Sequence, residues 1–236
     1  MKGMLYGIGV GPGDSELLTL KAKGAIERCD IIAYPVKKAG EKSTALEIIR
    51  PVVDVSSKEI MELLFVMDPS EEVRQEYRDA AMDEMCAAME AGKDVAMITL
   101  GDPCVYSTFM RICNDVRERG YDTEVVSGVP SFCHGAAKAG LPLMLAYEGL
   151  AIVPASEENM PKVSVALDDF ENIVIMKAFA SIDAIIALMN EKGIPLECAT
   201  VMSNIGMDTE YIGPLVAGRK YGYFTTVLVK KEGSRI

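Results

Sequence analysis

The chain has 236 residues, of which 50% are hydrophobic and 25% charged, and its formal net charge is -11. This composition is typical of a globular protein and excludes a disordered or collagen-like chain. The length is sufficient for two domains of modest size. The sequence contains no apolar run of about 18 residues, so we expect no transmembrane helix. Glycines interrupt the apolar N-terminal stretch before it reaches the length of a signal peptide.

The acidic charge balance limits the classes of partner. With 35 acidic against 24 basic residues, most of the surface would repel a phosphate backbone, so we expect no nucleic-acid partner. A small anionic substrate is still compatible, because a cleft can be locally basic. The six cysteines form no CxxC pair and indicate reduced thiols. We therefore predict a cytoplasmic protein without a membrane partner.

The first half of the sequence alternates between strand-like and helix-like segments. Apolar runs predict strands at 4–10, 30–35, 62–67 and 94–100, and a further strand after 121. Apolar residues at helical spacing predict helices at 15–29, 43–50, 70–92 and about 107–118. Asp14 or Ser15 is the expected N-cap of the first helix. The alternation predicts an α/β fold with a mostly parallel sheet.

The pattern changes after about residue 150. Five strand-like segments follow, with only two helical segments among them, at 150–155, 171–178, 198–206, 209–215 and 221–231. This arrangement favours a second α/β domain with a mixed sheet. We predict an N-terminal domain over 1–121 and a C-terminal domain over 122–236.

Three glycine-containing turns follow predicted strands, at Gly9–Asp14, Gly101–Pro103 and Ser127–Ser131. In open α/β sheets, ligands bind outside the carboxyl ends of the strands, so these turns are the candidate binding site. Glycine in such a turn lets the backbone approach a ligand closely.

The first turn does not match the dinucleotide-binding fingerprint. A GxGxxG motif that starts at Gly9 requires glycine at position 14, where the chain has Asp14. That carboxylate would also repel a pyrophosphate, and the sequence contains no GxxxxGK[ST] phosphate loop. The sequence therefore disfavours a nucleotide-dependent oxidoreductase.

Five motifs, which follow one another along the chain, resemble those of a known family. In chain order they are YGIGVGPGDSELLTLKAKGAIERCDIIAYP, ITLGDPCVYSTF, EVVSGVPSF, IVIMKAF and YFTTVLVKK. Together they resemble the tetrapyrrole methylases, the S-adenosylmethionine-dependent enzymes of corrin and sirohaem synthesis, over essentially the whole chain. Within that family the motifs look most like the branch that methylates carbon 20 of precorrin-2 or cobalt-factor II. Three alternatives are a methylase for uroporphyrinogen or a later precorrin position, a diphthine synthase, and a non-catalytic module that binds the cofactor.

The resemblance implies a homodimer of chains with two α/β domains, in which S-adenosylmethionine binds in the cleft between the domains and no metal is required. It assigns cofactor contacts to Gly101, Asp102, Val105, Tyr106, Pro130, Ser131, Met176, Lys177, Thr225 and Thr226. It places the anionic tetrapyrrole beside Gly9, Gly11, Pro12 and Gly13. Asp14 and Asp102 are the candidate catalytic residues. Helix capping by Asp14 and turn initiation by Asp102 are the structural alternatives.

The substrate that the resemblance implies has eight carboxylates, so its binding surface must be locally basic. Lys37 and Lys38 are the leading candidates, in a loop that extends to Lys42 and is either a flap over the substrate or a solvated loop. Arg111 and Lys177 are further candidates. The single histidine, His134, is expected either to pack within the fold or to touch the substrate. The general base and the choice between a metal-free and a cobalt-bearing substrate stay open.

Overall fold

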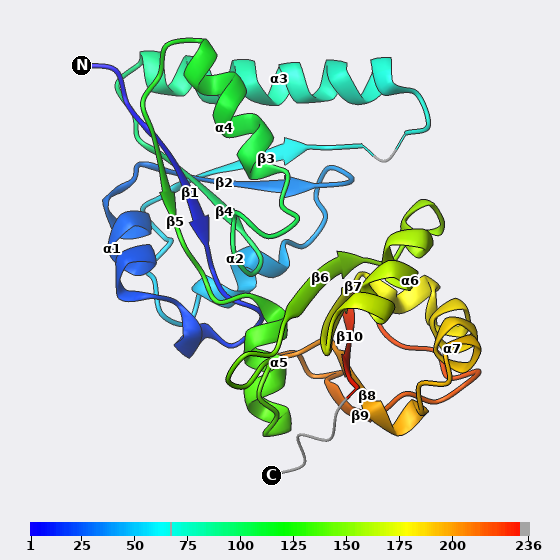
Figure 1. The fold of residues 1–236 in the computed structure, drawn as a ribbon. Helices are drawn as coiled ribbons and strands as arrows, with labels where there is room; N and C mark the ends of the chain where they lie inside the picture. Colours follow the sequence, from blue (N-terminus) through cyan, green and yellow to red (C-terminus); the bar gives the residue numbers. More distant parts are fainter. Residues whose placement is uncertain (67, 232–236) are drawn as a thin grey trace. The chain divides into compact units, whose positions relative to one another are not determined.

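The computed structural model describes residues 1–66 and 68–231 and divides into two compact units, Met1–Pro130 and Ser131–Ile236 (Figure 1). Each unit contains a five-stranded sheet with helices packed on it. The predicted pair of α/β domains, the first parallel and the second mixed, is confirmed. The division falls later than the expected boundary after residue 121, because strand β5 (Thr123–Val126) pairs with β1 (Leu5–Gly9) of the first sheet.

The first sheet has the strand order β3-β2-β4-β1-β5, and its neighbouring strands all pair in parallel. The strands not yet given are β2 (Ile31–Val36), β3 (Glu59–Leu64) and β4 (Val95–Thr99). Because all five strands run the same way, their carboxyl ends lie along one edge of the sheet. Every loop that follows a strand of this sheet therefore begins at that edge.

Two pairs of helices cover the two faces of the first sheet (Figure 1). One face packs against α1 (Leu20–Arg28) and α2 (Thr44–Ile49), and the other packs against α3 (Glu71–Glu90) and α4 (Phe109–Glu118). Successive strand residues alternate between these two cores. In β2, for example, Ile32 packs on the α1 side and Ile31 on the α3 side.

The first predicted helix is divided in the structure. A 3₁₀ turn spans Ser15–Leu17, and the α-helix begins only at Leu20. Thr19 is the N-cap of α1, because its hydroxyl accepts a hydrogen bond from the Ala22 N–H at 3.1 Å. The apolar spacing alone could not locate this interruption.

The third strand was predicted a few residues too late in the chain. The structure places β3 at Glu59–Leu64 instead of 62–67, because it pairs with β2 from Ile31 opposite Glu59 to Val36 opposite Leu64. Position 67, at the end of the predicted strand, lies outside the described residues. The register is set by the neighbouring strand, which a local apolar run does not report.

The second sheet has the order β6-β7-β10-β8-β9, in which only β6 and β7 pair in parallel. Its strands are β6 (Leu150–Pro154), β7 (Asn172–Met176), β8 (Ala199–Ser203), β9 (Tyr211–Pro214) and β10 (Thr225–Lys230). Helices α6 (Met160–Asp169) and α7 (Ile182–Glu191) share one core with the sheet. Helix α5 (Ser131–Ala139) packs so closely on β8 that a Cβ added at Gly135 would lie 2.6 Å from the Met202 sulfur.

Two further expectations concern the membrane and the thiols. Within residues 1–66 and 68–231, no helix is both long enough and apolar enough to cross a bilayer. All six cysteines carry free thiols. Burial raises the pKa of the Cys29 thiol to about 12, so this thiol stays protonated and behaves as a core side chain.

Candidate functional site

Four of the predicted site segments lie along the carboxyl edge of the first sheet. They follow strands β1, β2, β4 and β5, and they are Gly9–Asp14, Lys37–Lys38, Gly101–Tyr106 and Ser127–Pro130. Because β4 lies between β2 and β1, the lysines follow a strand close to those that carry the glycine turns. The structure thus brings these predicted residues to a single edge, which we call the first-sheet edge.

The β1 and β4 turns are joined by backbone hydrogen bonds. The Gly101 N–H donates to the Gly11 carbonyl at 2.8 Å, and the Gly11 N–H donates to the Gly101 carbonyl at 3.2 Å. These two bonds form an antiparallel bridge beyond the ends of the strands. The two turns therefore hold each other in place.

The glycines of the first-sheet edge serve two different purposes. A Cβ on Gly128 would lie 2.1 Å from the Gly101 carbonyl oxygen, and a Cβ on Gly9 would lie 2.6 Å from that same oxygen. These two positions must be glycine because backbones pack there. Gly101 has a φ of +72°, and a Cβ on it would meet only the Val129 carbonyl oxygen, at 4.0 Å. The backbone of Gly101 is therefore open to the approach of a ligand.

Asp102 ties two of these turns together. Its side chain is buried, with Oδ1 accepting a hydrogen bond from the Cys104 N–H at 2.8 Å and Oδ2 accepting one from the Gly128 N–H at 3.0 Å. The first bond is the turn-initiating contact that the sequence offered as the structural alternative. The second joins the β4 turn to the β5 turn. Contact of Asp102 with a cofactor stays a prediction, whereas its role as a tie is observed.

Tyr106 is presented by an unusual backbone conformation. Its φ is +49°, in the left-handed region, and 44% of the residue is exposed. Burial of the rest of the side chain raises the pKa of its hydroxyl, so Tyr106 is neutral near pH 7. Strained, exposed residues of this kind cluster at binding sites. Val105 precedes Tyr106, and its N–H donates to the Asp102 carbonyl at 3.2 Å.

Asp14 is a capping residue in the structure. Its Oδ1 accepts a hydrogen bond from the Glu16 N–H at 2.9 Å, which begins the 3₁₀ turn. Pro12 and Gly13 connect it to the bridged Gly11. The capping alternative is therefore confirmed, and the catalytic role of Asp14 stays a prediction.

The loop from Lys37 to Lys42, which we call the lysine loop, is tied to strand β3. The Gly40 N–H donates to Glu62 Oε2 at 2.9 Å, and the other oxygen of Glu62 accepts from the Tyr34 hydroxyl at 3.2 Å. Lys37 and Lys38 are exposed. Glu62 thus holds a basic loop at the first-sheet edge, a contact that the sequence did not predict.

The second unit brings its predicted residues to one edge of its own sheet. Met176–Lys177 ends β7 and Thr225–Thr226 begins β10, and since these strands are antiparallel both pairs lie at the same edge, here called the second-sheet edge. Lys177 is exposed, with a φ of +57°. The Thr225 hydroxyl donates to the Gly222 carbonyl at 2.5 Å and is almost fully buried. Thr225 therefore stabilises the chain itself at this edge.

The sequence analysis missed Asn204 at the same edge. Asn204 follows β8, has a φ of +50°, and donates its N–H to the Phe224 carbonyl at 2.9 Å. Its side-chain amide lies so close to Gly222 that a Cβ there would be 2.1 Å away. The SNIG turn after an apolar strand was the available signal.

Pro130 and Ser131 stand where the chain passes from the first unit to the second, and Ser131 begins α5. His134 lies three positions further along α5, close enough to Glu210 to influence the pKa of its carboxyl. Burial opposes ionisation of Glu210, but the Gly206 N–H at 2.7 Å, Lys138 and His134 together hold the pKa of the carboxyl below its usual range. Lys138 thus forms the ion pair that joins α5 to Glu210, at 2.6 Å, and the choice between packing and substrate contact for His134 stays a prediction.

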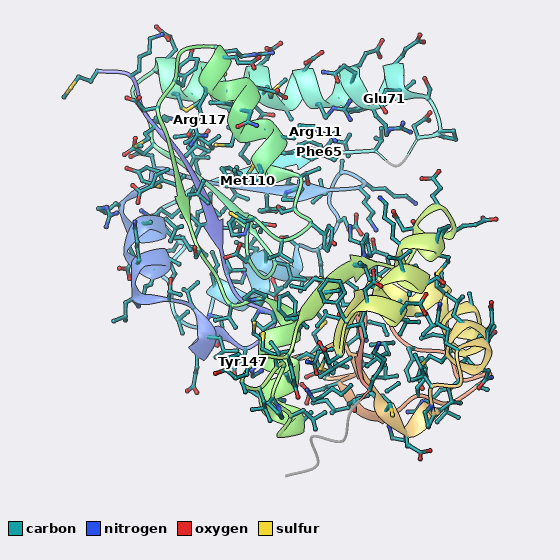
Figure 2. The ribbon with its side chains drawn as sticks, viewed as in Figure 1. Phe65, Glu71, Met110, Arg111, Arg117 and Tyr147 are labelled. Carbon is teal, nitrogen blue, oxygen red and sulfur yellow. The ribbon has the colours of Figure 1, made fainter. Side chains whose placement is uncertain are left out.

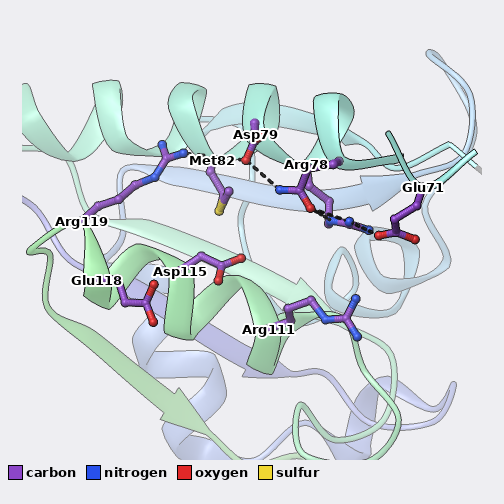
Figure 3. A pocket seen from close by; sticks show the side chains of 9 residues that line it. Glu71, Arg78, Asp79, Met82, Arg111, Asp115, Glu118 and Arg119 are labelled. Atoms are coloured by element: carbon purple, nitrogen blue, oxygen red, sulfur yellow. Dashed lines mark hydrogen bonds and ion pairs between the residues drawn. The ribbon is translucent and has the colours of Figure 1, made fainter. Parts of the chain in front are cut away.

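Arg111 lies in the first turn of α4 and lines a hollow of about 440 Å³ between α3 and α4 (Figures 2 and 3). The hollow contains charges of both signs, since Glu71 pairs with Arg78 and Asp79 lies 4.0 Å from Arg119. Hydrogen bonds from Arg78 and Arg74 lower the pKa of Glu71 to about 2. Arg111 therefore lies among charges of both signs, and its contact with the macrocycle stays a prediction.

Comparison with known proteins identifies similar sequences along nearly the whole chain. The sequence profile of the Tetrapyrrole (Corrin/Porphyrin) Methylases matches residues 4–218. The chain is 40% identical to a probable cobalt-precorrin-2 C(20)-methyltransferase of Methanocaldococcus jannaschii, over 73% of this chain and 71% of that protein. It is 30% identical to the cobalt-precorrin-2 C(20)-methyltransferase of Salmonella typhimurium, over 98% of each.

A solved structure shows the same fold. The uroporphyrin-III C-methyltransferase of Thermus thermophilus, complexed with S-adenosylhomocysteine, superimposes with a TM-score of 0.68 at 19% identity. The match covers 97% of this chain and 98% of that one. At this identity the likeness concerns the fold alone.

Proposed function

Because the chain belongs to the tetrapyrrole (corrin/porphyrin) methylases, we propose that it transfers a methyl group from S-adenosylmethionine to carbon 20 of a precorrin-2-type macrocycle in cobalamin biosynthesis. The observation that carries the proposal is the similarity to the Salmonella C(20)-methyltransferase along almost the entire length of both chains. That similarity distinguishes carbon 20 from the other positions that this fold serves. Cobalt-precorrin-2 and precorrin-2 are both candidate substrates, since relatives of each name match.

The first-sheet edge fits the chemical groups of the cofactor. S-adenosylmethionine carries a carboxylate, an ammonium group and ribose hydroxyls, which backbone N–H and C=O groups can bind. Gly101 has no side chain and open space beside it, so a ligand can approach this turn closely, although the N–H and C=O of Gly101 are themselves paired with Gly11. Val105 and Tyr106 lie in the same turn. We propose the remaining cofactor contacts at the residues that the family motifs indicate, Pro130, Ser131, Met176, Lys177, Thr225 and Thr226.

Methyl transfer requires mainly that the cofactor and the macrocycle are aligned and that water is excluded. The bound cofactor would supply a methyl group on a positively charged sulfur, so that S-adenosylhomocysteine needs no general acid to leave, and the proton that carbon 20 carries must then pass to a base. The chain's task is to hold the macrocycle against that methyl group. The joined turns at Gly11, Gly101 and Gly128 provide a rigid support for this alignment. Asp14 is the residue that we propose for orienting the macrocycle beside Gly9–Gly13.

A paired turnover assay tests the proposal. The protein is incubated with S-adenosylmethionine and either precorrin-2 or a cobalt-bearing macrocycle, supplied as cobalt-precorrin-2 and as its oxidised form cobalt-factor II. The products are weighed by mass spectrometry and assigned by carbon NMR. We expect one added methyl group, at carbon 20. Methylation at another carbon would assign the chain to a different branch of the family. No methylation of either macrocycle, with S-adenosylhomocysteine still bound, would overturn the proposed reaction.

The lysine loop carries the next prediction. We propose that Lys37 and Lys38 bind carboxylates of the macrocycle, because both are exposed at the first-sheet edge and Glu62 fixes their loop. Replacing both with glutamate should raise KM for the macrocycle about tenfold or more, through repulsion of its carboxylates, and should leave KM for S-adenosylmethionine unchanged. Steady-state kinetics at two salt concentrations measures both constants.

The matched control is the double substitution of Arg28 and Lys93 with glutamate. Both residues are exposed, and they precede β2 and β4, so they lie at the amino edge of the sheet, opposite the edge that carries the lysine loop. This control makes the same change in net charge at another place. Equal KM values for the macrocycle in the two double variants would show that the change in overall charge causes the increase. The lysine loop would then be a solvated loop that does not bind the macrocycle.

We also propose that the enzyme works as a cytoplasmic homodimer. The family resemblance supports the dimer, and the free thiols support the compartment. Sedimentation equilibrium of the full chain measures the assembly state. A monomer at micromolar concentration would contradict the dimer.

A further inference from the structure

Glu62 of strand β3 holds the lysine loop from the neighbouring strand. In the register of the first sheet, Glu62 lies directly opposite Tyr34 of β2, and the loop begins three positions after Tyr34. One carboxylate oxygen of Glu62 accepts the Gly40 N–H at 2.9 Å, and the other accepts the Tyr34 hydroxyl at 3.2 Å. A single carboxylate therefore joins the end of β2 to the middle of the lysine loop.

Tyr34 anchors this contact in the core of the first unit. It is only 4% exposed and packs among the apolar side chains between the sheet and helices α1 and α2. Burial and the negative charge of Glu62 raise the pKa of the Tyr34 hydroxyl, so the hydroxyl keeps its proton and donates it to Glu62 in a hydrogen bond. The buried donor thus fixes one oxygen of Glu62, and the other oxygen binds the loop.

The lysine loop also closes on itself. The Glu41 N–H donates to the Lys38 carbonyl at 3.2 Å, and Gly40, which lies between them, has a φ of +72°, the left-handed value that glycine supplies in a type II turn. The Glu41 carboxylate accepts the Lys37 N–H at 3.1 Å. Glu41 and Glu62 thus both bind the backbone of the loop, and together these contacts give it a defined conformation.

We propose that Glu62 is a positioning residue for the macrocycle, because it fixes the lysine loop in the conformation in which Lys37 and Lys38 bind carboxylates. The inference rests on the proposed function, which assigns carboxylates of the macrocycle to these two lysines. All the contacts that carry it lie within the first unit. A loop that orders only when its ligand binds loses conformational entropy in that step, and Glu62 lowers this cost by ordering the loop beforehand.

The sign of the effect distinguishes positioning from charge. Glu62 is a negative group beside a surface proposed to bind a polycarboxylate, so by charge alone its removal should tighten binding. Positioning predicts weaker binding, because fewer hydrogen bonds would hold the loop.

Two substitutions at position 62 separate these effects. Glu62→Ala and Glu62→Gln remove the same charge, but glutamine keeps a carbonyl oxygen for the Gly40 N–H and an amide that can donate to the Tyr34 hydroxyl oxygen. The difference between the two variants therefore measures the contribution of the hydrogen bonds.

The test measures loop order and macrocycle binding separately. Trypsin cleaves after lysine, so its rate of cleavage after Lys37, Lys38 and Lys42 in the full chain without ligands reports opening of the loop. Uroporphyrin III, a stable octacarboxylate tetrapyrrole, is the binding probe, and its own fluorescence is followed. Glu59→Ala is the matched control, because Glu59 is an exposed carboxylate of the same strand that pairs with Lys93 at the amino edge of the sheet.

We expect Glu62→Ala to be cleaved in the lysine loop about tenfold faster than the wild type and to bind the probe about fivefold more weakly. Glu62→Gln should restore most of the wild-type behaviour in both measurements, and Glu59→Ala should match the wild type in both. Equal or tighter probe binding by Glu62→Ala, or binding by Glu62→Gln as weak as that of Glu62→Ala, would overturn the positioning role. Unchanged cleavage in Glu62→Ala, or a wild type that does not bind the probe, would also overturn it.

Neither measurement depends on turnover, so the two proposals can fail separately. If the chain methylates neither macrocycle, but its probe affinity falls in Glu62→Ala and returns in Glu62→Gln, the positioning role is upheld and the proposed reaction is contradicted. Methylation at carbon 20 with the same KM for the macrocycle in Glu62→Ala and the wild type would uphold the reaction and contradict the positioning role.

Discussion

Gly128→Ala is expected to be among the most damaging single-methyl substitutions in the chain. The new Cβ would lie 2.1 Å from the Gly101 carbonyl oxygen and 2.7 Å from the Gly9 carbonyl carbon. Both neighbours are backbone atoms and cannot rotate away. We expect the free energy of unfolding to fall by about 1–3 kcal/mol, the range for an overpacked core, and S-adenosylhomocysteine binding to be lost as the turns separate. Urea denaturation and calorimetry measure the two effects.

Gly24→Ala is the matched control for this substitution. It makes the same chemical change inside α1, where the new Cβ would meet only the end of the Arg28 side chain at 3.4 Å. Alanine is favoured over glycine in a helix by up to about 1 kcal/mol, so the control should be as stable as the wild type or more so. Wild-type stability and affinity in Gly128→Ala would contradict the close packing of these turns.

The fold could be predicted from the sequence to a large extent, because its signals are local. The apolar run 94–100 and the long amphipathic stretch 70–92 predicted β4 and α3 at nearly the positions that the structure shows. The errors occur where strand pairing or a side-chain hydrogen bond sets the limits of an element. The limits of β3 depend on its register with β2, and the start of α1 depends on the hydroxyl of Thr19.

The sequence predicted where the candidate site lies in the first sheet, but it did not predict which contacts each residue makes there. Glycine turns after parallel strands indicated the first-sheet edge, since all carboxyl ends of such a sheet meet there. The sequence could not show that Gly128 and Gly9 serve backbone packing while Gly101 is open, because this depends on distances between turns. It also could not find the contact between the rings of Phe179 and Tyr223, whose centroids lie 5.0 Å apart although the two residues are more than forty positions apart along the chain.

Asp102→Ala should lower both stability and cofactor affinity, because the carboxylate ties the β4 turn to the β5 turn. The substitution removes the acceptors of two backbone N–H groups, those of Cys104 and Gly128. Loss of hydrogen bonds to a buried charged group is expected to cost about 1–3 kcal/mol of unfolding free energy, and S-adenosylhomocysteine affinity should fall about tenfold or more. Asp54→Ala is the matched control, since Asp54 accepts the Ser56 N–H at 2.9 Å in an exposed turn of the same kind.

Asp102→Asn separates the tie from a direct charge contact with the cofactor. Asparagine offers one acceptor oxygen and places an amide nitrogen against the second N–H. If Asp102 acts by joining the two turns, the stability and the cofactor affinity of Asp102→Asn should both lie between those of the wild type and those of Asp102→Ala. A residue that acts only through its charge on the cofactor predicts wild-type stability in Asp102→Asn with a full loss of affinity. That second result would show that the loss of affinity does not come from separation of the two turns. The hydrogen bonds to Cys104 and Gly128 exist without any cofactor, so their loss should lower the stability of the free protein as well. Urea denaturation without ligand, followed by calorimetry with S-adenosylhomocysteine, distinguishes the two.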